Sequence, residues 1–154
     1  MEITLLAVGK LRPSLRDVAD DYARRLGRYV TLHEVEVKEA SRAPTPGAQR
    51  VEEARRLATR VPPGGVLVAL ARAGTSWTSE ELARQVTRWR LAARPVALAI
   101  GGSHGLGDEM IARASIRWSL GPLTLPHELA RVLVLEQLYR AFTILGGAQY
   151  HKGR

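Results

Sequence analysis

The stretch VALAIGGSHGLGDEM, residues 96–110, is an apolar run followed by a glycine-dense turn and two acids. A buried strand that ends in glycines allows the backbone to approach its surroundings closely. The acids Asp108 and Glu109 suit the first turn of a helix, which carries a partial positive charge. The stretch therefore predicts a strand, a tight turn and a helix in direct succession, as in α/β proteins.

Other segments extend this pattern along the chain. Residues 3–8 (ITLLAV) and 66–71 (VLVALA) are also continuous apolar runs, which are typical of strands covered by helices on both faces. Residues 31–37 (TLHEVEV) alternate between apolar and polar, and residues 116–120 form a shorter alternating strand. We predict one α/β domain over residues 1–154, with a mostly parallel sheet flanked by helices.

Helical patterns separate these strands. The first begins at Pro13, and the third begins with a capping box formed by Thr78 and Glu81. Residues 40–50 (ASRAPTPGAQR) are linker-like, because they hold two prolines and a glycine, but they are too short to divide the chain. The apolar positions that mark the first two helices are Leu15, Val18, Tyr22 and Leu26, then Val51, Ala54, Leu57 and Val61.

A longer helix is predicted near the C-terminus. It begins at Pro126, since proline is tolerated in a first turn, and ends near Leu145, before two glycines. Its apolar residues cover more than one narrow stripe. So broad an apolar surface predicts contact with a partner subunit as well as with the domain's own core, and hence a homodimer.

Composition excludes several classes of protein. The chain has 154 residues and 45% hydrophobic content, but its apolar runs are too short to span a membrane. It contains no cysteine, which excludes disulfides, thiolate metal ligands and a cysteine nucleophile. Its four histidines lack metal-ligand spacing, so we expect no metal. The N-terminus carries no basic leader, and we therefore expect a cytoplasmic protein without membrane contact.

The charge balance favours a polyanionic partner. Lysine and arginine number 23 against 15 acidic residues, for a net charge of +8, and cationic side chains release counterions from phosphates. Compositional bias is the alternative explanation, because nearly all of these cations are arginine.

The glycine turn does not match known phosphate-binding loops. After Gly105 and Gly107, a dinucleotide fingerprint requires glycine where Met110 stands, and a P-loop requires lysine where Asp108 stands. Two acids at a helix N-terminus would also repel phosphate. A neutral or cationic ligand fits better, and the alternative is that the glycines only make a tight turn.

The C-terminal residues 150–154 (YHKGR) combine an aromatic ring, an imidazole and two cationic side chains. This composition suits stacking on a nucleic-acid base and contact with its phosphate. The alternative is an ordinary solvated chain end.

Three stretches together resemble the ribosomal large-subunit methyltransferase family that methylates N3 of a pseudouridine in 23S rRNA, within the SPOUT (α/β-knot) superfamily. They are IGG.HGL at residues 100–106, WSLGPLTLPHELARVLVLEQLYRAF at residues 118–142 and YH at residues 150–151. LLAVGK and LARAGTSWTSEELA are similar too, so the resemblance covers essentially the whole chain. Ser103 and His104 depart from the family form, which has a proline and an acid there.

The resemblance implies an α/β fold with a C-terminal trefoil knot, and a homodimer with its cofactor pocket beside the subunit interface. It implies S-adenosylmethionine as cofactor, which carries no phosphate and has a cationic sulfonium, so the acids after the glycine turn fit it. The residues that the family pattern assigns to cofactor binding lie in three loops: Leu70, Ala71, Gly101, Gly102, Gly121, Pro122, Leu123, Thr124, Leu125 and Pro126.

The resemblance also implies 23S rRNA in the assembled ribosome as substrate. His151 is the candidate base or proton relay for N3, because an ordinary histidine is mostly neutral at cellular pH. Tyr150 is the candidate for stacking on or orienting the base, and Arg140 for contacting phosphate or stabilising the uracil anion. Further candidates for rRNA contact, against a merely solvated role, are Arg12, Arg24, Arg25, Arg28, Arg50, Arg55 and Arg56.

Two alternative functions stay open at this point. One is a SPOUT methyltransferase that acts on tRNA or on a ribose 2′-hydroxyl. The other is a ribosome-binding protein that keeps the fold without catalysis.

Overall fold

The computed structural model describes residues 1–151, and of His151 the backbone alone. These residues form a five-stranded sheet in the order β2-β1-β4-β3-β5, and every neighbouring pair is parallel. The strands are β1 (Glu2–Val8), β2 (Thr31–Val37), β3 (Val66–Ser76), β4 (Val96–Ile100) and β5 (Ile116–Ser119).

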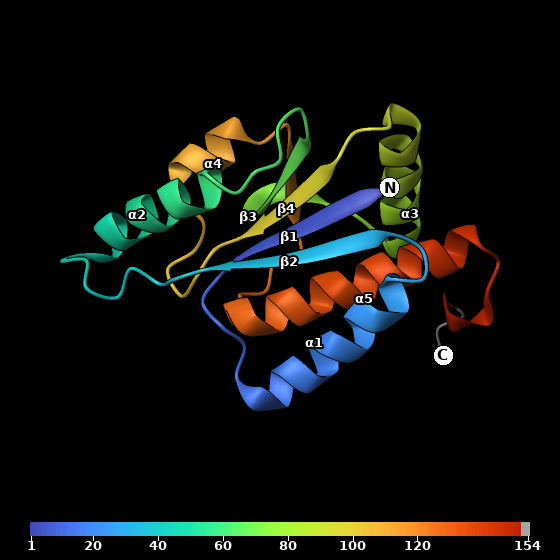
Figure 1. Ribbon diagram of the computed structural model, residues 1–154, viewed down its shortest axis with the longest axis horizontal. Helices are drawn as coiled ribbons and strands as arrows, with labels where there is room; N and C mark the ends of the chain where they lie inside the picture. Colours follow the sequence, from blue (N-terminus) through green and yellow to red (C-terminus); the bar gives the residue numbers. More distant parts are fainter. Residues whose placement is uncertain (152–154) are drawn as a thin grey trace.

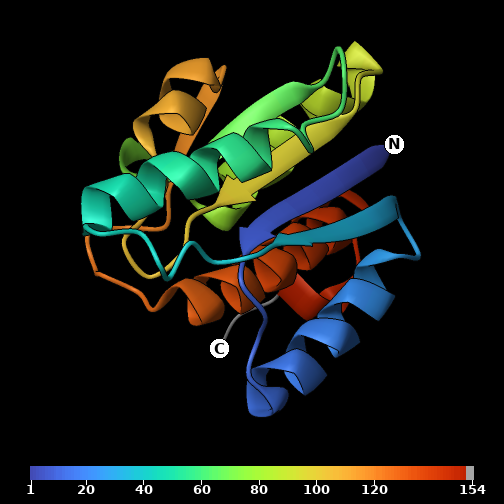
Figure 2. The ribbon, with the colours of Figure 1, turned by 60° about the vertical axis from the view of Figure 1, so that its left-hand side comes forward.

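Helices cover both faces of this sheet (Figures 1 and 2). They are α1 (Pro13–Leu26), α2 (Pro46–Ala58), α3 (Ser79–Ala92), α4 (Asp108–Arg113), α5 (His127–Leu145) and the 3-10 helix η1 (Gln149–His151). One apolar core lies between the sheet and α1, α3 and α5, and a second lies between the sheet and α2 and α4. The predicted α/β fold with a mostly parallel sheet flanked by helices is confirmed.

Several local predictions are confirmed in detail. Strand β2 has the predicted bounds, β4 begins at Val96 as the quoted stretch does, and α5 ends at Leu145 before the two glycines. The capping box is present, with the Thr78 side chain accepting from the Glu81 backbone and the Glu81 carboxylate accepting from the Thr78 backbone. These features depend on neighbouring residues alone, which is why the sequence predicts them well.

The linker-like stretch is only partly a linker. Its second half is the start of α2, because Pro46 suits a first turn and the Thr45 hydroxyl accepts from the Ala48 backbone at 3.0 Å. Val18 and Val51, predicted on the apolar faces of their helices, are instead exposed. In α2 the buried positions include the polar Gln49 and Glu53. The buried face of this helix is therefore partly polar, and the spacing of apolar residues does not identify it.

Strand β3 is longer than predicted and is irregular. Its pairing with β5 shifts between Leu70 and Thr75, so the residues between them leave the regular ladder at the edge of the sheet. Gly74 permits this close passage, because a Cβ there would lie 2.6 Å from the Arg117 carbonyl oxygen. The irregularity places Ala71 and Arg72 beside the loop that follows β4.

Two further expectations concern membrane-spanning helices and the trefoil knot. No helix in the described part of the chain is long and apolar enough to cross a membrane. The C-terminal trefoil knot stays a prediction.

Candidate functional site

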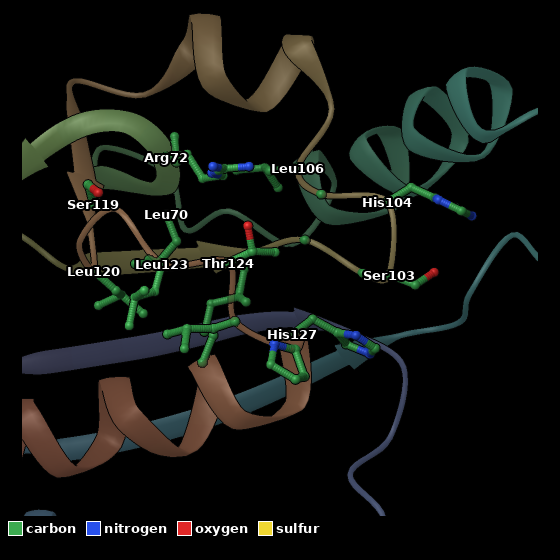
Figure 3. Close-up of a pocket in the computed structure, with 18 of the residues that line it drawn as sticks. Leu70, Arg72, Ser103, His104, Leu106, Ser119, Leu120, Leu123, Thr124 and His127 are labelled. Carbon is green, nitrogen blue, oxygen red and sulfur yellow. The ribbon is translucent and has the colours of Figure 1, made fainter.

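A cleft of about 730 Å³ lies at the carboxyl ends of β4 and β5, beside the irregular part of β3 (Figure 3). Most of its lining comes from residues 70–72 within β3, from residues 100–106 at and after the end of β4, and from residues 118–127 at and after the end of β5. Open parallel sheets bind ligands at this edge, and the volume suits a ligand of cofactor size.

The glycine turn after β4 forms one wall of the cleft. Gly105 donates its backbone N–H to the Gly102 carbonyl oxygen at 3.0 Å, which closes the turn. A Cβ on Gly101 would lie 2.3 Å from the backbone nitrogen of Leu106, so a larger residue there would displace the turn. The glycines therefore keep backbone, rather than side chains, at the surface of the cleft.

The loop after β5 forms the opposite wall. The buried Ser119 hydroxyl lies 3.2 Å from both the backbone nitrogen and the carbonyl oxygen of Gly121, which adopts a φ of +115°. Beyond this turn, the Leu123 side chain is 75% exposed, although it lines the cleft. Figure 3 shows Thr124 inside the cleft, with its hydroxyl directed toward Arg72 and Leu106. An apolar wall with few polar groups suits a flat, largely apolar ring.

The structure brings together nine of the ten residues predicted to bind the cofactor. Pro122 is the exception, because it is exposed and does not line the cleft. Sequence reasoning did not assign other lining residues to the cofactor, although the quoted motifs contain them. They include Arg72, Ile100, Leu106, Trp118, Ser119, His127 and Ala130. Ser103 and His104 lie at the rim, and Figure 3 shows His104 pointing away from the centre.

The N-terminal end of α5, beside the cleft, is tied to the loop after β1. Glu128 accepts from the Arg12 backbone at 2.6 Å and forms an ion pair with the Arg12 guanidinium at 2.9 Å. These hydrogen bonds hold the pKa of the Glu128 carboxyl below its usual range. The contact fixes where α5 begins, and thereby where Pro126 and His127 border the cleft.

A second group of residues, the tail cluster, lies near the other end of α5. It consists of Glu136, Arg140 and Tyr150, packed against Tyr22 and Tyr139. The Arg140 guanidinium contacts Glu136 Oε1 at 2.6 Å and lies 5.0 Å from the centre of the Tyr150 ring. The Tyr150 hydroxyl donates to the same carboxylate oxygen at 3.1 Å. One carboxylate thus orients both the cation and the phenol.

The environment of the tail cluster constrains its chemistry. Burial, the contact with Tyr22 and the negative charge of Glu136 all raise the pKa of the Tyr150 phenol. The hydrogen bond with Glu136 raises the pKa of Arg140 as well. Tyr150 therefore stays a protonated hydrogen-bond donor near neutral pH, and it does not serve as a general base there.

A single chain does not bring the tail cluster to the cleft. His127 at the cleft and Arg140 are 13 residues apart on one helix, which corresponds to about 20 Å at 1.5 Å per residue. The predicted trio of Arg140, Tyr150 and His151 thus gathers around the C-terminal end of α5, apart from the nine cofactor residues. The side chain of His151 lies outside the described part of the structure.

The arginines expected to contact rRNA differ in their surroundings. Arg12 pairs with Glu128, Arg24 and Arg25 pair with Asp21, and Arg55 and Arg56 pair with Glu52. Within residues 1–150, no ion pair includes Arg28 or Arg50. Their contact with rRNA stays a prediction.

Comparisons with known proteins identify the family. The family model described as "Predicted SPOUT methyltransferase" matches residues 1–151. Ribosomal RNA large subunit methyltransferase H of Azotobacter vinelandii is 44% identical over 155 residues, covering 99% of this chain and 100% of that protein. The protein of the same name from Pseudomonas aeruginosa is 43% identical with the same coverage. A probable methyltransferase from Bordetella pertussis has a similar fold, with a TM-score of 0.57 and 19% identity over 90% of this chain and 95% of that one. The chain belongs to the SPOUT methyltransferase family.

Proposed function

We propose that this protein transfers a methyl group from S-adenosylmethionine to N3 of a pseudouridine in 23S rRNA of the assembled ribosome. The observation that carries the proposal is the cleft, because the three loops of the family pattern meet in it. The chain also matches ribosomal RNA large subunit methyltransferases along its whole length. The substrate places the protein in the cytoplasm, where bacterial ribosomes work.

The cleft fits S-adenosylmethionine in size and chemistry. Leu120, Leu123 and Leu125 provide apolar surface for the adenine ring, and backbone groups of the two turns provide donors and acceptors for its edge. The acids Asp108 and Glu109 in the first turn of α4 disfavour phosphate, which this cofactor lacks. When bound, the cofactor supplies a methyl group activated by attachment to a cationic sulfonium.

The tail cluster supplies the groups that act on the target base. Arg140 is a fixed cation, suited to a phosphate or to the negative charge that develops on uracil when N3 loses its proton. Tyr150 is held as a donor and an aromatic surface for orienting the base. With the Tyr150 phenol protonated, His151 is the residue of this trio suited to accept the N3 proton.

A homodimer would join the two halves of the site. Because Arg140 and the cleft are about 20 Å apart in one chain, we infer that a second copy contributes the tail cluster. Leu129 and Leu145 are exposed apolar residues on α5, and Leu123 is exposed beside it, as a subunit interface would require.

The decisive experiment is methyl transfer from labelled cofactor to purified ribosomes, followed by mapping of the modified nucleotide. Label on N3 of a 23S rRNA pseudouridine is the expected result. Label on tRNA or on a ribose hydroxyl would replace the proposed substrate with the alternative one. If calorimetry shows that the protein binds ribosomes but not the cofactor, the protein is a ribosome-binding protein and not an enzyme.

A further inference from the structure

A buried carboxylate lies behind the glycine wall of the cleft. Glu53 belongs to α2, on the face of the sheet opposite α5, and its side chain is 2% exposed. Buried acids normally pair with a cation or have all their acceptor positions satisfied, because burying a charge is costly. Glu53 is therefore a residue whose environment requires an explanation.

Only one of its two carboxylate oxygens has partners. Oε1 accepts from the Ala40 backbone at 3.0 Å and from the Gln49 side chain at 2.8 Å. Oε2 is buried, and no hydrogen-bond partner for it is found among residues 1–150. Within residues 1–150, no ion pair includes Glu53. Residues 1–150 therefore offer no cation to a negative charge on Glu53.

The unpartnered oxygen faces the cleft wall. A Cβ built on Gly102 would lie 3.1 Å from Glu53 Oε2 and 3.0 Å from a methyl of Val8. Gly102 itself lines the cleft, so a ligand touching this turn would have one layer of backbone between it and the carboxylate. Little water separates the two, and a charge interaction across this layer is weakly screened.

We propose that Glu53 is the counter-charge for a cationic ligand in the cleft, and that it makes the cleft prefer a sulfonium cofactor over its neutral thioether product. The inference rests on the proposed function, because it takes S-adenosylmethionine as the ligand. On methyl transfer the S–CH₃ bond breaks and the N3–CH₃ bond forms, while the bonding electron pair stays on sulfur. The N3 proton goes to the base. The product S-adenosylhomocysteine has lost the sulfonium charge, so the attraction to Glu53 weakens and product release is favoured.

The test compares the two ligands by calorimetry on the full chain. In Glu53→Gln we expect the Kd of S-adenosylmethionine to rise about tenfold, because the variant removes an opposite unit charge that acts across a weakly screened layer of backbone. The Kd of S-adenosylhomocysteine stays within twofold, because glutamine keeps the shape and the Oε1 hydrogen bonds. Glu52→Gln is the matched control, since it removes the same charge from the partly exposed neighbouring residue and leaves both Kd values unchanged.

A second variant covers the case in which Glu53→Gln does not fold. In Gln49→Lys the new ammonium group pairs with Glu53 from a position already in contact with it, and we expect the same selective loss of S-adenosylmethionine binding. Equal losses for both ligands, or no loss in either variant, would overturn the inference and leave the proposed function standing. Wild-type protein that binds neither ligand would instead overturn the proposed cofactor.

Discussion

The two ends of α5 border very different environments. At its N-terminal end the cleft is built from backbone turns and apolar side chains, with Gly101 and Gly121 where larger residues would disturb the shape. At its C-terminal end the tail cluster is built from ionised and hydrogen-bonding side chains around Glu136. The first arrangement suits holding a ligand of fixed shape, and the second suits managing protons and charge. Their separation of about 20 Å on one rigid helix is the structural argument for a site shared between two chains.

The middle of α5 holds the two ends in place. The Arg131 side chain is buried, and it donates to the Gly9 carbonyl oxygen at 3.1 Å and contacts Glu36 at 3.2 Å. Helix α5 is thereby attached to the ends of β1 and β2. Such an anchored helix gives one chain no internal route for moving its tail cluster to its own cleft.

The largest effect is expected at the tail cluster. Arg140→Ala should lower methyl transfer by roughly 100- to 1,000-fold, the effect of removing one donor that stabilises developing charge, and leave cofactor affinity within twofold. Turnover with labelled cofactor and calorimetry measure the two quantities. Arg84→Ala is the control, an exposed helical arginine that also lies near a glutamate. Loss of cofactor affinity in Arg140→Ala would contradict the assignment of cofactor binding to the cleft alone.

The next largest effect is expected at the glycine turn. Gly101→Ala places a Cβ against the Leu106 backbone, so the turn must move, and a displacement of about 1 Å costs on the order of 100-fold in activity. Here cofactor affinity should fall together with turnover. Gly47→Ala, in the first turn of α2 where a Cβ would make only ordinary van der Waals contacts, controls for the substitution itself. If the Gly101→Ala protein folds and binds cofactor normally, the glycine turn is not part of the cofactor site.

Mixing these two variants tests whether the site is shared. If each site takes its cleft from one chain and its tail cluster from the other, half of randomly mixed dimers are heterodimers with one intact site of two. Co-expressed Gly101→Ala and Arg140→Ala chains should then recover about a quarter of wild-type activity. Activity no higher than that of the better single variant would show that both halves must come from one chain.

The smallest effect is expected where α5 begins. Because Arg12 lowers the pKa of Glu128, their contact stabilises the folded state above the ordinary carboxyl pKa and is lost as the pH falls through the lower folded value. Arg12→Gln should melt slightly below wild type at pH 7, and the difference in melting temperature should shrink as the pH falls below the ordinary carboxyl pKa. Arg28→Gln, in which no described ion pair is removed, should show no such pH-dependent difference. A melting difference of constant size across the whole acid range would show that Arg12 acts through packing instead.

The sequence predicted local features well and the site unevenly. Glycine and proline positions marked the turns of the cleft, and nine of the ten residues proposed for the cofactor do line it. Arg72 was missed because the irregularity in β3 that places it there depends on how β5 passes Gly74. Glu53 was missed because α2 buries a polar face that apolar periodicity does not reveal.

The sequence by itself determined the strands, the capped helices and the glycine turns, because these depend on side-chain periodicity and on residues a few positions apart. Only the tertiary structure decided that residues 70–72, 100–106 and 118–127 meet in one cleft, since neighbouring parallel strands come from distant parts of the chain. The tertiary structure also decided that Arg140 and Tyr150 gather around Glu136 and lie away from that cleft. The physical reason is the length of α5, which is anchored at both its start and its middle.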